Sequence, residues 1–322
     1  MTIPEFESAL NQWGREQAPF LFLVDFELEN LLAWKINEVP DDIWVSIGNF
    51  SRGPSLIENP KKIFLTKHPI SFSDYETMFE LIKERIRFGD SYLANLTIKT
   101  KIDLNASLGE LFFSSKAKYK LCWENNFLVF SPETFIQIKE KKIFSFPMKG
   151  TIDASVANAQ QLILTDPKEL SEHVTIVDLI RNDLSAVANN ITVNRFRYVE
   201  KIRTSQNDLF QVSSEIAGDL SDDYARSLGT LLTTLLPAGS VSGAPKKKTT
   251  QIIRDAEKEN RGYYTGVFGY FDGENMDSAV MIRFIEQHGD AFYYRSGGGI
   301  TAQSVAEKEY QEAIDKIYVP VY

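Results

Sequence analysis

The fold class is decided by residues 119–146, YKLCWENNFLVFSPETFIQIKEKKIFSF. Apolar and β-branched residues gather there in short runs, and turn-forming residues separate the runs. We predict four strands, at Tyr119–Trp123, Phe127–Phe130, Thr134–Lys139 and Lys142–Phe146. The connections are too short for a helical crossover, so neighbouring strands are expected to pair antiparallel. The stretch therefore favours an α+β fold, with antiparallel sheet and helices outside, over alternating β and α units.

On the N-terminal side, we expect a strand at Phe20–Phe26, and later a helix followed by a second strand. Ser73-Asp-Tyr-Glu76 has the pattern of a capping box that opens the helix, and Gly89 should end it. The segment SYLANLTIK, residues 91–99, then alternates in hydrophobicity, which predicts a half-buried strand. Its buried face would carry Tyr92, Ala94, Leu96 and Ile98.

On the C-terminal side, Asp166 followed by Pro167 predicts the N-cap and first position of a helix that runs to about Asp183. A capping box at Ser304 and Glu307 should open the last helix. The other predicted elements are helices at Asp222–Leu235 and Lys246–Asn260, a hairpin of Tyr263–Asp272 with Ser278–Glu286, and a strand at Ala291–Ser296.

Composition excludes several classes of protein. Hydrophobic residues make up 43% of the 322 residues and charged residues 25%, so a packed core is expected. The net charge of −9 argues against nucleic-acid binding, and no uncharged apolar run is long enough to cross a membrane. A single cysteine, Cys122, cannot form an internal disulfide, so a cytoplasmic location is expected. With three histidines and one cysteine, carboxylates are the expected ligands of any metal.

Four features leave two interpretations open on residue chemistry alone. Leu236–Lys246 and the glycine run Ser296–Ile300 can be plain connections or can hold an anion on exposed backbone N–H groups. Glu309 and Glu312 share a helix face, which can be a solvated acidic face or, with Glu172, a Mg²⁺ site. Lys149, at the end of a predicted strand, can be a surface residue or a nucleophile.

Taken in order along the chain, eight motifs resemble those of the chorismate-utilising enzymes, which include anthranilate, aminodeoxychorismate, isochorismate and salicylate synthases. The resemblance covers residues 71–318 and implies one large α+β domain over residues 1–322, with residues 1–70 a shortened N-terminal part. The motifs are GDSYLANLT (89–97), SPETF (131–135), PMKGT (147–151), SEHVTIVDLIRNDL (171–184), GSVSGAPK (239–246), RGYYTGVFGY (261–270), NMDSAVMIR (275–283) and GGGI…EYQEAIDK (297–316).

The resemblance also implies roles for the matched positions. Glu133 would be the general acid that protonates the departing C4 hydroxyl of chorismate. Lys149 would attack C2 and form a covalent intermediate. Mg²⁺ would be held by Glu172, Glu309 and Glu312. The substrate would be bound by Arg283, Tyr264, Lys316, Gly298 and Gly299, with Gly150, Thr151, Ser242, Gly243 and Ala244 also lining its pocket.

Lys149 also suggests which activity within the family to expect. Aminodeoxychorismate synthases resemble this chain in a lysine at that position, where anthranilate and isochorismate synthases commonly have alanine. The implied reaction is amination of chorismate at C4, with ammonia from a separate glutamine amidotransferase subunit. Two alternatives stay open: an anthranilate synthase component I, and a relative that binds chorismate without turnover.

Several positions depart from the family pattern. Leu93 stands where ammonia-using members usually have glutamine, and Gln211 stands where the family has histidine. Ile152-Asp153-Ala154 replaces arginines after the PMKGT motif, and Phe284 replaces threonine. The N-terminal part is shorter than that of anthranilate synthases, so feedback inhibition by tryptophan is not expected.

Overall fold

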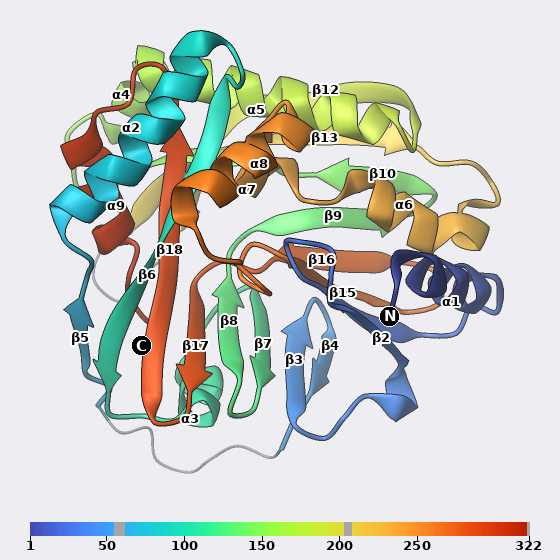
Figure 1. Ribbon diagram of the computed structural model, residues 1–322. Helices are drawn as coiled ribbons and strands as arrows, with labels where there is room; N and C mark the ends of the chain where they lie inside the picture. The colour runs from blue at the N-terminus through green and yellow to red at the C-terminus, as the bar shows by residue number, and fades with distance from the viewer. Residues whose placement is uncertain (55–61, 203–207, 321–322) are drawn as a thin grey trace.

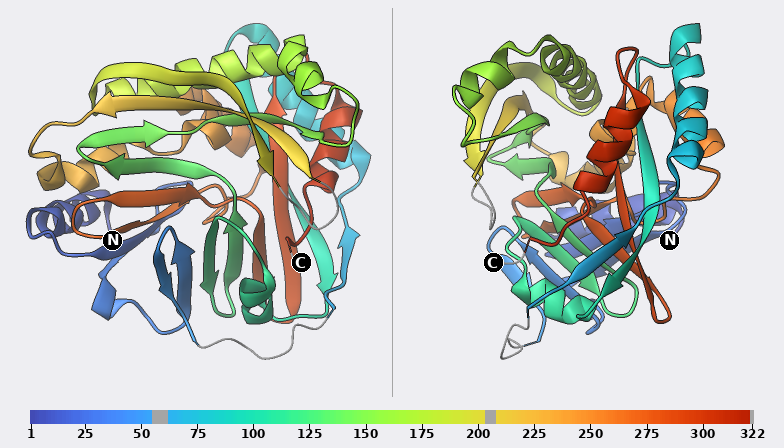
Figure 2. Two further views of the ribbon diagram at one scale, coloured as in Figure 1. Left: turned by 180° about the vertical axis from the view of Figure 1, so that it is seen from behind. Right: turned by 90° about the vertical axis from the view of Figure 1, so that its left-hand side faces the viewer.

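The chain folds as two antiparallel sheets packed face to face, with helices on their outer faces (Figure 1). The computed structural model describes residues 1–54, 62–202 and 208–320. Figure 2 shows the two sheets as separate layers in its right-hand view. The α+β class predicted from residues 119–146 is confirmed, because every strand pair in the described residues is antiparallel.

Within the described residues, the first sheet has nine strands in the order β11-β13-β10-β9-β16-β15-β1-β2, and β12 pairs with β13 outside this path. Its strands are β1 (Phe20–Val24), β2 (Leu31–Lys35), β9 (Thr134–Lys139), β10 (Lys142–Ser145), β11 (Met148–Asp153), β12 (Asn189–Ile202), β13 (Leu209–Asp219), β15 (Val267–Phe271) and β16 (Met276–Val280).

The second sheet, counted over the same described ranges, also has nine strands, in the order β14-β6-β18-β17-β8-β7-β3-β4, and β5 pairs with β6. Its strands are β3 (Ile43–Ile47), β4 (Phe50–Arg52), β5 (Leu65–His68), β6 (Leu93–Leu104), β7 (Tyr119–Trp123), β8 (Phe127–Ser131), β14 (Gly243–Ala244), β17 (Phe284–His288) and β18 (Ala291–Ile300).

Helices cover both outer faces. Helices α1, α5 and α6 lie on the first sheet, whereas α2, α8 and α9 pack beside β6 and β18 of the second. The helices are α1 (Ile3–Arg15), α2 (Phe72–Phe88), α3 (Leu108–Ser114), α4 (Ala159–Thr165), α5 (Pro167–Ser185), α6 (Leu228–Leu235), α7 (Gly239–Ser242), α8 (Lys246–Glu257) and α9 (Ala306–Asp315), with 3₁₀ turns at Ile36–Glu38 and Tyr224–Ser227.

The sequence of β1, FLFLV, explains how the layers are held together. All five residues are buried, and successive side chains of a strand point to opposite faces. Phe20, Phe22 and Val24 enter the core under α1 and α6, whereas Leu21 and Leu23 enter the core between the sheets. A strand buried on both faces therefore has no polar alternation, which is why its sequence is a continuous apolar run.

The four strands predicted between residues 119 and 146 are confirmed to within one residue, as β7, β8, β9 and β10. The helix predicted at Asp166 is also confirmed, because the Asp166 side chain accepts a hydrogen bond from the backbone N–H of Glu169. Gly89 ends α2 in the left-handed conformation with φ 89°, as expected for a C-terminal glycine.

Both predicted capping boxes are misplaced. Helix α2 begins at Phe72, and Ser71 caps it by accepting from the N–H of Asp74. Helix α9 begins at Ala306 without a side-chain cap. The hydroxyl of Ser304 instead accepts from the backbone N–H of Thr301, in the turn before the helix.

Other predicted boundaries also change. The predicted strand Ser278–Glu286 is two strands, because the chain passes from β16 in one sheet to β17 in the other around Arg283. The predicted strand Ala291–Ser296 continues through the glycines to Ile300. Tyr92 is 69% exposed and precedes β6, so the buried face of that strand begins at Ala94.

Among the described residues, no helix is both long enough and apolar enough to cross a lipid bilayer.

Candidate active site

Lys149 lies on β11 at an irregularity of the first sheet. Met148 pairs with Ser213 and Thr151 with Gln211, so three steps along β11 match two along β13. This extra residue is a β-bulge, which bends a strand and turns a side chain out of register. Gly150 completes it with φ 79°, and a Cβ there would lie 2.7 Å from Oε2 of Glu169. The bulge therefore requires glycine at position 150 and sets the direction of Lys149.

The amine of Lys149 lies between three other elements. Its Nζ is 3.9 Å from Oε2 of Glu172 on α5. A Cβ placed on Gly299 of β18 would lie 3.1 Å from that Nζ and 3.0 Å from Cδ1 of Leu93 on β6. Residues separated by about 150 positions in the sequence thus meet where the edge of one sheet approaches the other.

Glu133 lies just before β9, at the turn between β8 and β9. Its backbone N–H donates to the hydroxyl of Ser131, 3.0 Å away, and its carbonyl accepts from Val280 of β16. Burial raises the pKa of the Glu133 carboxyl above its usual range. A short hydrogen bond from Ser240 and the nearby charges of Lys149, Arg283 and Lys316 act in the opposite direction.

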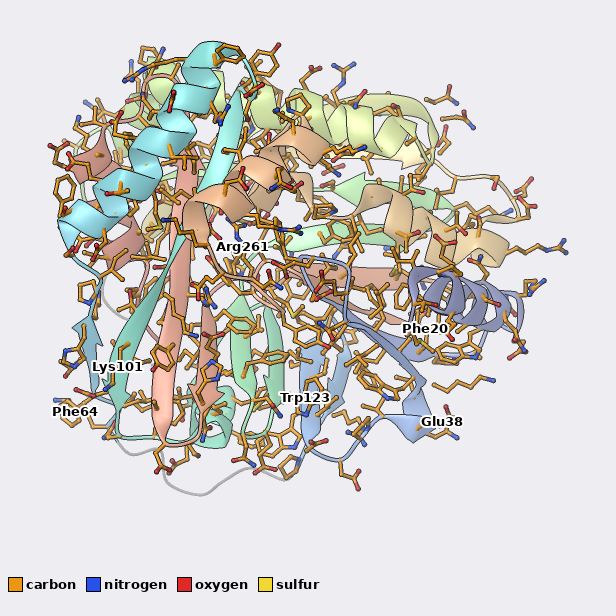
Figure 3. The ribbon with its side chains drawn as sticks, in the orientation of Figure 1. Phe20, Glu38, Phe64, Lys101, Trp123 and Arg261 are labelled. Atoms are coloured by element: carbon orange, nitrogen blue, oxygen red, sulfur yellow. The ribbon has the colours of Figure 1, made fainter. Side chains whose placement is uncertain are left out.

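The loop that carries Ser240 is fixed by a buried arginine. Arg261, labelled in Figure 3, is 2% exposed and donates to the carbonyl oxygens of Val241 at 2.9 Å and Asn95 at 2.6 Å. It also pairs with Glu257 of α8 at 2.6 Å. These bonds join α7, β6 and α8, so Arg261 fixes the position of the segment that carries Ser240.

Three predicted pocket residues pack within that loop. Ser242 is fully buried and donates to the carbonyl of Ala238 at 2.9 Å. Gly243 and Ala244 form β14 and pair with Ala94 and Leu93. A Cβ on Gly243 would lie 2.0 Å from the carbonyl oxygen of Leu93, so glycine permits this close pairing. In this structure the three residues hold the loop against β6.

On the other face of β18, Gly298 lies beneath α9. A Cβ at Gly298 would lie 3.4 Å from Oε1 of Glu312, 3.6 Å from Nζ of Lys316 and 3.7 Å from Oε2 of Glu309. The Lys316 amine donates to Glu312 at 2.6 Å and to the carbonyl of Gly297 at 2.8 Å. Glycine therefore leaves room for two carboxylates and an ammonium group over bare backbone.

Arg283 lies in the crossing between the sheets, with φ 54°. Its guanidinium stands 5.3 Å from the centre of the Tyr318 ring, and its Nε is 3.4 Å from the Tyr318 hydroxyl oxygen. Tyr264 is 3% exposed, packs against Phe284, and burial raises its pKa to about 12. Thr151 is exposed on β11. Arg283 is thus held as a cation beside the ring of Tyr318.

The family model described as chorismate binding enzyme matches residues 28–321. The chain belongs to the chorismate binding enzyme family. The match spans most of the sequence and includes every residue of the site described above. The family resemblance found in the eight motifs is thereby confirmed.

Relatives in this family carry more than one name. An uncharacterized PabA-like protein of Haemophilus influenzae is 47% identical over 99% of this chain and 98% of its own length. Aminodeoxychorismate synthase component 1 of Bacillus subtilis is 30% identical over 78% of this chain and 55% of its own length. Anthranilate synthase component 1 of Aquifex aeolicus is 36% identical over 58% of this chain and 38% of its own length.

Solved structures agree on the fold. Anthranilate synthase component I of Streptococcus pneumoniae matches with a TM-score of 0.65 and 28% identity, over 79% of this chain and 58% of that one. The menaquinone-specific isochorismate synthase of Escherichia coli matches with a TM-score of 0.75 and 17% identity, over 98% of this chain and 81% of that one. The chain spans little more than half of several characterised relatives that it matches.

The expected Mg²⁺ ligands of this family member are only partly brought together. Glu309 and Glu312 meet over Gly298, and two carboxylates with waters and substrate oxygens are a usual ligand set for Mg²⁺. Glu172 lies beside Lys149 instead. Within the described ranges, no group of three or more His, Cys, Asp or Glu side chains is close enough to hold an ion. The donor chemistry at Gly298 fits Mg²⁺, with Glu172 as a separate carboxylate.

Sequence reasoning about the chorismate binding enzyme motifs missed two contacting residues. Ser240, inside GSVSGAPK, donates to Glu133, and a hydroxyl at the start of a short helix gives no sign of this partner. Tyr318 follows the last motif and contacts Arg283. An aromatic residue two positions after Lys316 was the available signal.

Proposed function

We propose that this chain is an aminodeoxychorismate synthase component 1, which converts chorismate and ammonia to 4-amino-4-deoxychorismate and water. The observation that carries the proposal is the environment of Lys149. Its amine projects from a bulge toward the Gly299 backbone, and its charge acts on the half-buried carboxyl of Glu133. A nucleophile and a general acid in one electrostatic neighbourhood are the two groups that displacement of a hydroxyl requires.

Substrate binding is supported by a local group of cations. Chorismate carries two carboxylates, and the charges of Lys149, Arg283 and Lys316 all act at Glu133 although the whole chain has a net charge of −9. Arg283 suits a carboxylate because its guanidinium offers paired donors in one plane. Gly298 and Gly299 are buried and carry no side chain, so the charged groups of Lys316 and Lys149 lie close to bare backbone.

In the first step, the ammonium group of Lys149 gives one proton to the Glu172 carboxylate, 3.9 Å away, and takes it back when the cycle ends. The resulting neutral amine adds to C2 of the ring and the double bonds shift. The bond between C4 and its hydroxyl oxygen breaks as Glu133 gives that oxygen a proton, so the hydroxyl leaves as water. The raised pKa of Glu133 serves this role, because it keeps a larger fraction of the carboxyl protonated near neutral pH.

In the second step, ammonia adds at C4 and the double bonds shift back as the bond between C2 and Lys149 breaks. The new C4 nitrogen releases one proton, which the Glu133 carboxylate accepts. Both catalytic groups thus return to their starting states, and the sum is chorismate plus ammonia giving the amine and water. Lys149 acts as a covalent catalyst that splits one displacement into two.

Mg²⁺ is the proposed cofactor, held by Glu309 and Glu312 over Gly298, with Glu172, beside Lys149, contributing acidic charge. When bound, the ion supplies positive charge that offsets the charge of the ring carboxylate. Lys316 already donates to Glu312, so the chain itself supplies part of that positive charge.

A glutamine amidotransferase is the proposed source of ammonia. The names of the characterised relatives designate a component 1, that is, one part of a larger enzyme. Cys122, the single cysteine of this sequence, is fully buried, and burial raises its pKa to about 12. It is therefore unsuited to the nucleophilic attack that glutamine hydrolysis would require.

Anthranilate synthase component 1 is the second candidate, favoured by the 36% identity with the Aquifex aeolicus protein. That reaction would place ammonia at C2 and release pyruvate. Lys149 argues against it, because its amine would occupy the space from which ammonia would reach C2.

The test is to incubate the purified chain with chorismate, Mg²⁺ and ammonium at mildly alkaline pH and to identify the product. The proposal predicts a compound in which amine replaces the C4 hydroxyl and the enolpyruvyl group is retained, as judged by mass and by nuclear magnetic resonance. Anthranilate with pyruvate would support the second candidate. Unchanged chorismate at saturating ammonium would contradict both.

A further inference from the structure

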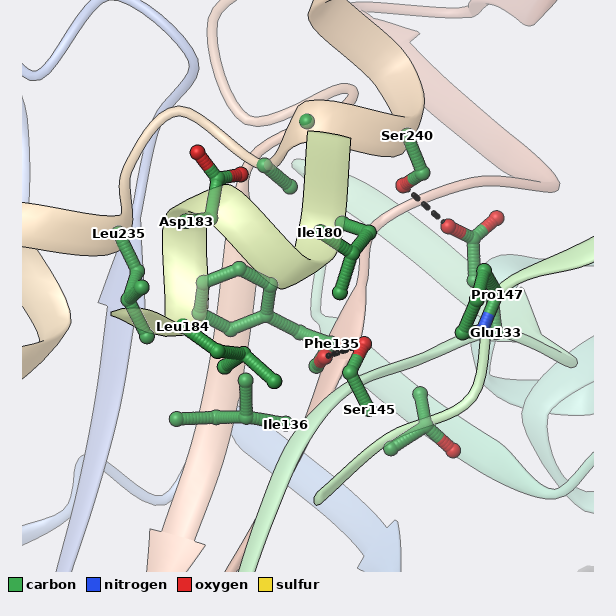
Figure 4. A pocket seen from close by; sticks show the side chains of 13 residues that line it. Glu133, Phe135, Ile136, Ser145, Pro147, Ile180, Asp183, Leu184, Leu235 and Ser240 are labelled. Carbon is green, nitrogen blue, oxygen red and sulfur yellow. Dashed lines mark hydrogen bonds between the residues drawn. The ribbon is translucent and has the colours of Figure 1, made fainter. Parts of the chain in front are cut away.

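A small cavity lies behind Glu133, between α5, β9, β10 and the turn that joins α6 to α7 (Figure 4). About 20 Å³ of it is free for a water-sized molecule. Its walls are mainly apolar and include Phe135, Ile180, Leu184 and Leu235. In Figure 4, Glu133 and Ser240 lie on one side of this space, and Asp183 and Leu235 lie on the other.

The size of the cavity decides what can occupy it. A free volume of about 10–15 Å³ is enough for one water molecule, whereas drug-sized ligands occupy pockets of several hundred Å³. Chorismate is therefore excluded. One molecule of the size of water or ammonia fits in this space, which Glu133 helps to line.

The lining also discriminates by charge. An apolar wall strongly disfavours an ion without a partner, so neutral ammonia passes more readily than ammonium. The Asp183 side, opposite Glu133, carries its own ion pair. Asp183 and Lys246 are 2.8 Å apart, with side chains 14% and 18% exposed. That pair is nearer to solvent than the apolar walls formed by Leu184 and Leu235.

The chemistry of the proposed function needs such a space. Glu133 gives a proton to the leaving hydroxyl, so water forms at C4 next to its carboxyl. Ammonia must then reach the same carbon and return one proton to the same carboxylate. One small molecule thus leaves and another arrives at Glu133 while the ring, attached to Lys149, blocks the substrate side.

We propose that the cavity behind Glu133 is the ammonia site of this enzyme, where neutral ammonia enters and the water product is exchanged. The inference rests on the proposed function. It adds the place where ammonia enters and the residues that select ammonia. Glu133 accepts an N–H hydrogen bond from the bound ammonia, and Ser240 holds the carboxyl in position.

Ala238 provides the first test, because it is 1% exposed and lines the cavity. Ala238→Val adds two methyl groups to the wall and should raise the KM for ammonia by about tenfold or more, since one methylene in a pocket changes selectivity by that amount. The KM for chorismate should stay within twofold of its value in the unmodified chain. The matched control is Ala9→Val, at an alanine packed against the same core but outside the cavity.

Ile180→Val provides the second test. The substitution removes one methyl group from the cavity wall, and methylamine is larger than ammonia by one methyl group. The rate with methylamine relative to ammonia should rise by about tenfold in this variant. Ile191→Val, at an isoleucine that packs on the same core outside the cavity, should leave the ratio unchanged.

The outcomes separate this inference from the proposed function. Aminated product from the unmodified chain establishes the function, and an unchanged ammonia KM in Ala238→Val with an unchanged methylamine ratio in Ile180→Val would then overturn the cavity. Equal increases in the KM for ammonia and for chorismate would also overturn it. Absence of aminated product from the unmodified chain would overturn both.

Discussion

Ser240 donates a short hydrogen bond to the carboxyl of Glu133, and this bond lowers a pKa that burial raises. Ser240→Ala should therefore raise the pKa of Glu133 further. Because the proposed first step needs protonated Glu133, the fall in kcat at high pH should move to higher pH. A pH profile of kcat tests this, and Ser240→Thr should restore the original profile.

The matched control for this pH profile is Ser185→Ala. Ser185 lies on the exposed side of α5 and donates to the carbonyl of Asn182. An identical shift in the control, or an unmoved profile in Ser240→Ala, would mean that Ser240 does not act through Glu133.

Gly299 leads to a second prediction at the residue scale. In Gly299→Ala, the new Cβ would lie 3.1 Å from the Lys149 amine and 3.0 Å from Leu93. Gly299 does not have a positive φ, so alanine is compatible with its backbone. Displacement of the nucleophile should lower kcat by about 100-fold, as misplacement by 1 Å can. Initial rates measure this, and Gly289→Asn, in an open turn, is the control.

The motifs predicted the identity of Lys149 as a candidate, but its environment could not be predicted. The bulge at Gly150 depends on pairing with β13, whose partner residues lie about 60 positions later. The contact with Gly299 depends on the approach of the second sheet. Neither the strand pairing nor the contact between the sheets can be read from the residues next to Lys149. The residue type alone therefore left open whether Lys149 is a nucleophile or a surface residue.

At the scale of elements, α9 is held by a buried lysine of α2. Lys83 is 5% exposed and donates to the carbonyl oxygens of Thr301, Ala302 and Ser304 at 3.2, 2.7 and 3.0 Å. These carbonyls form the turn that precedes α9. The helix that carries Glu309 and Glu312 therefore starts from a turn organised around one ammonium group.

Lys83→Met should lower the free energy of unfolding by about 2–4 kcal/mol, because three carbonyls lose a charged donor while the desolvation cost of the buried ammonium, which offsets part of that loss, is removed with it. Denaturant unfolding measures the change. Lys67→Met removes a single bond to Ile314, near the other end of α9, and should cost about a third as much. Equal losses in the two variants would contradict this account of the turn.

Strands and helix ends differ in how well sequence predicts them. Strands β7 to β10 follow one another through short turns, so local pattern determines their bounds. The hydroxyl of Ser304 was available as a cap for α9, but it bonds to the Thr301 turn that Lys83 organises. Long-range contacts also break the predicted strand at Arg283, where the chain changes sheets.

At the scale of the whole molecule, a half-buried aspartate links the two sheets. Asp277 on β16 of the first sheet accepts from the Tyr119 hydroxyl of β7 in the second, at 2.9 Å. It also accepts from Gln137 on β9 at 3.1 Å. Burial raises the pKa of Asp277 above its usual range, so the folded chain holds this proton more tightly than the unfolded chain.

Stability should therefore fall as pH rises from the unfolded pKa, about 4, through the higher folded pKa. Asp277→Asn keeps an acceptor for Tyr119 but cannot ionise, so its Tm relative to the unmodified chain should increase with pH. Lys142 lowers the pKa of the exposed Asp219. Asp219→Asn should therefore show the opposite trend. Parallel curves of Tm against pH for Asp277→Asn and the unmodified chain would contradict this account.

The central claim is that the amine of Lys149 carries out amination at C4. The most direct measurement compares the rate of 4-amino-4-deoxychorismate formation by the unmodified chain, by Lys149→Ala and by the exposed-lysine control Lys139→Ala. Loss of the nucleophile should lower the rate by at least about 100-fold in Lys149→Ala alone, with unchanged thermal unfolding. Formation of the same product by Lys149→Ala at the unmodified rate would contradict the covalent route and the assignment built on it.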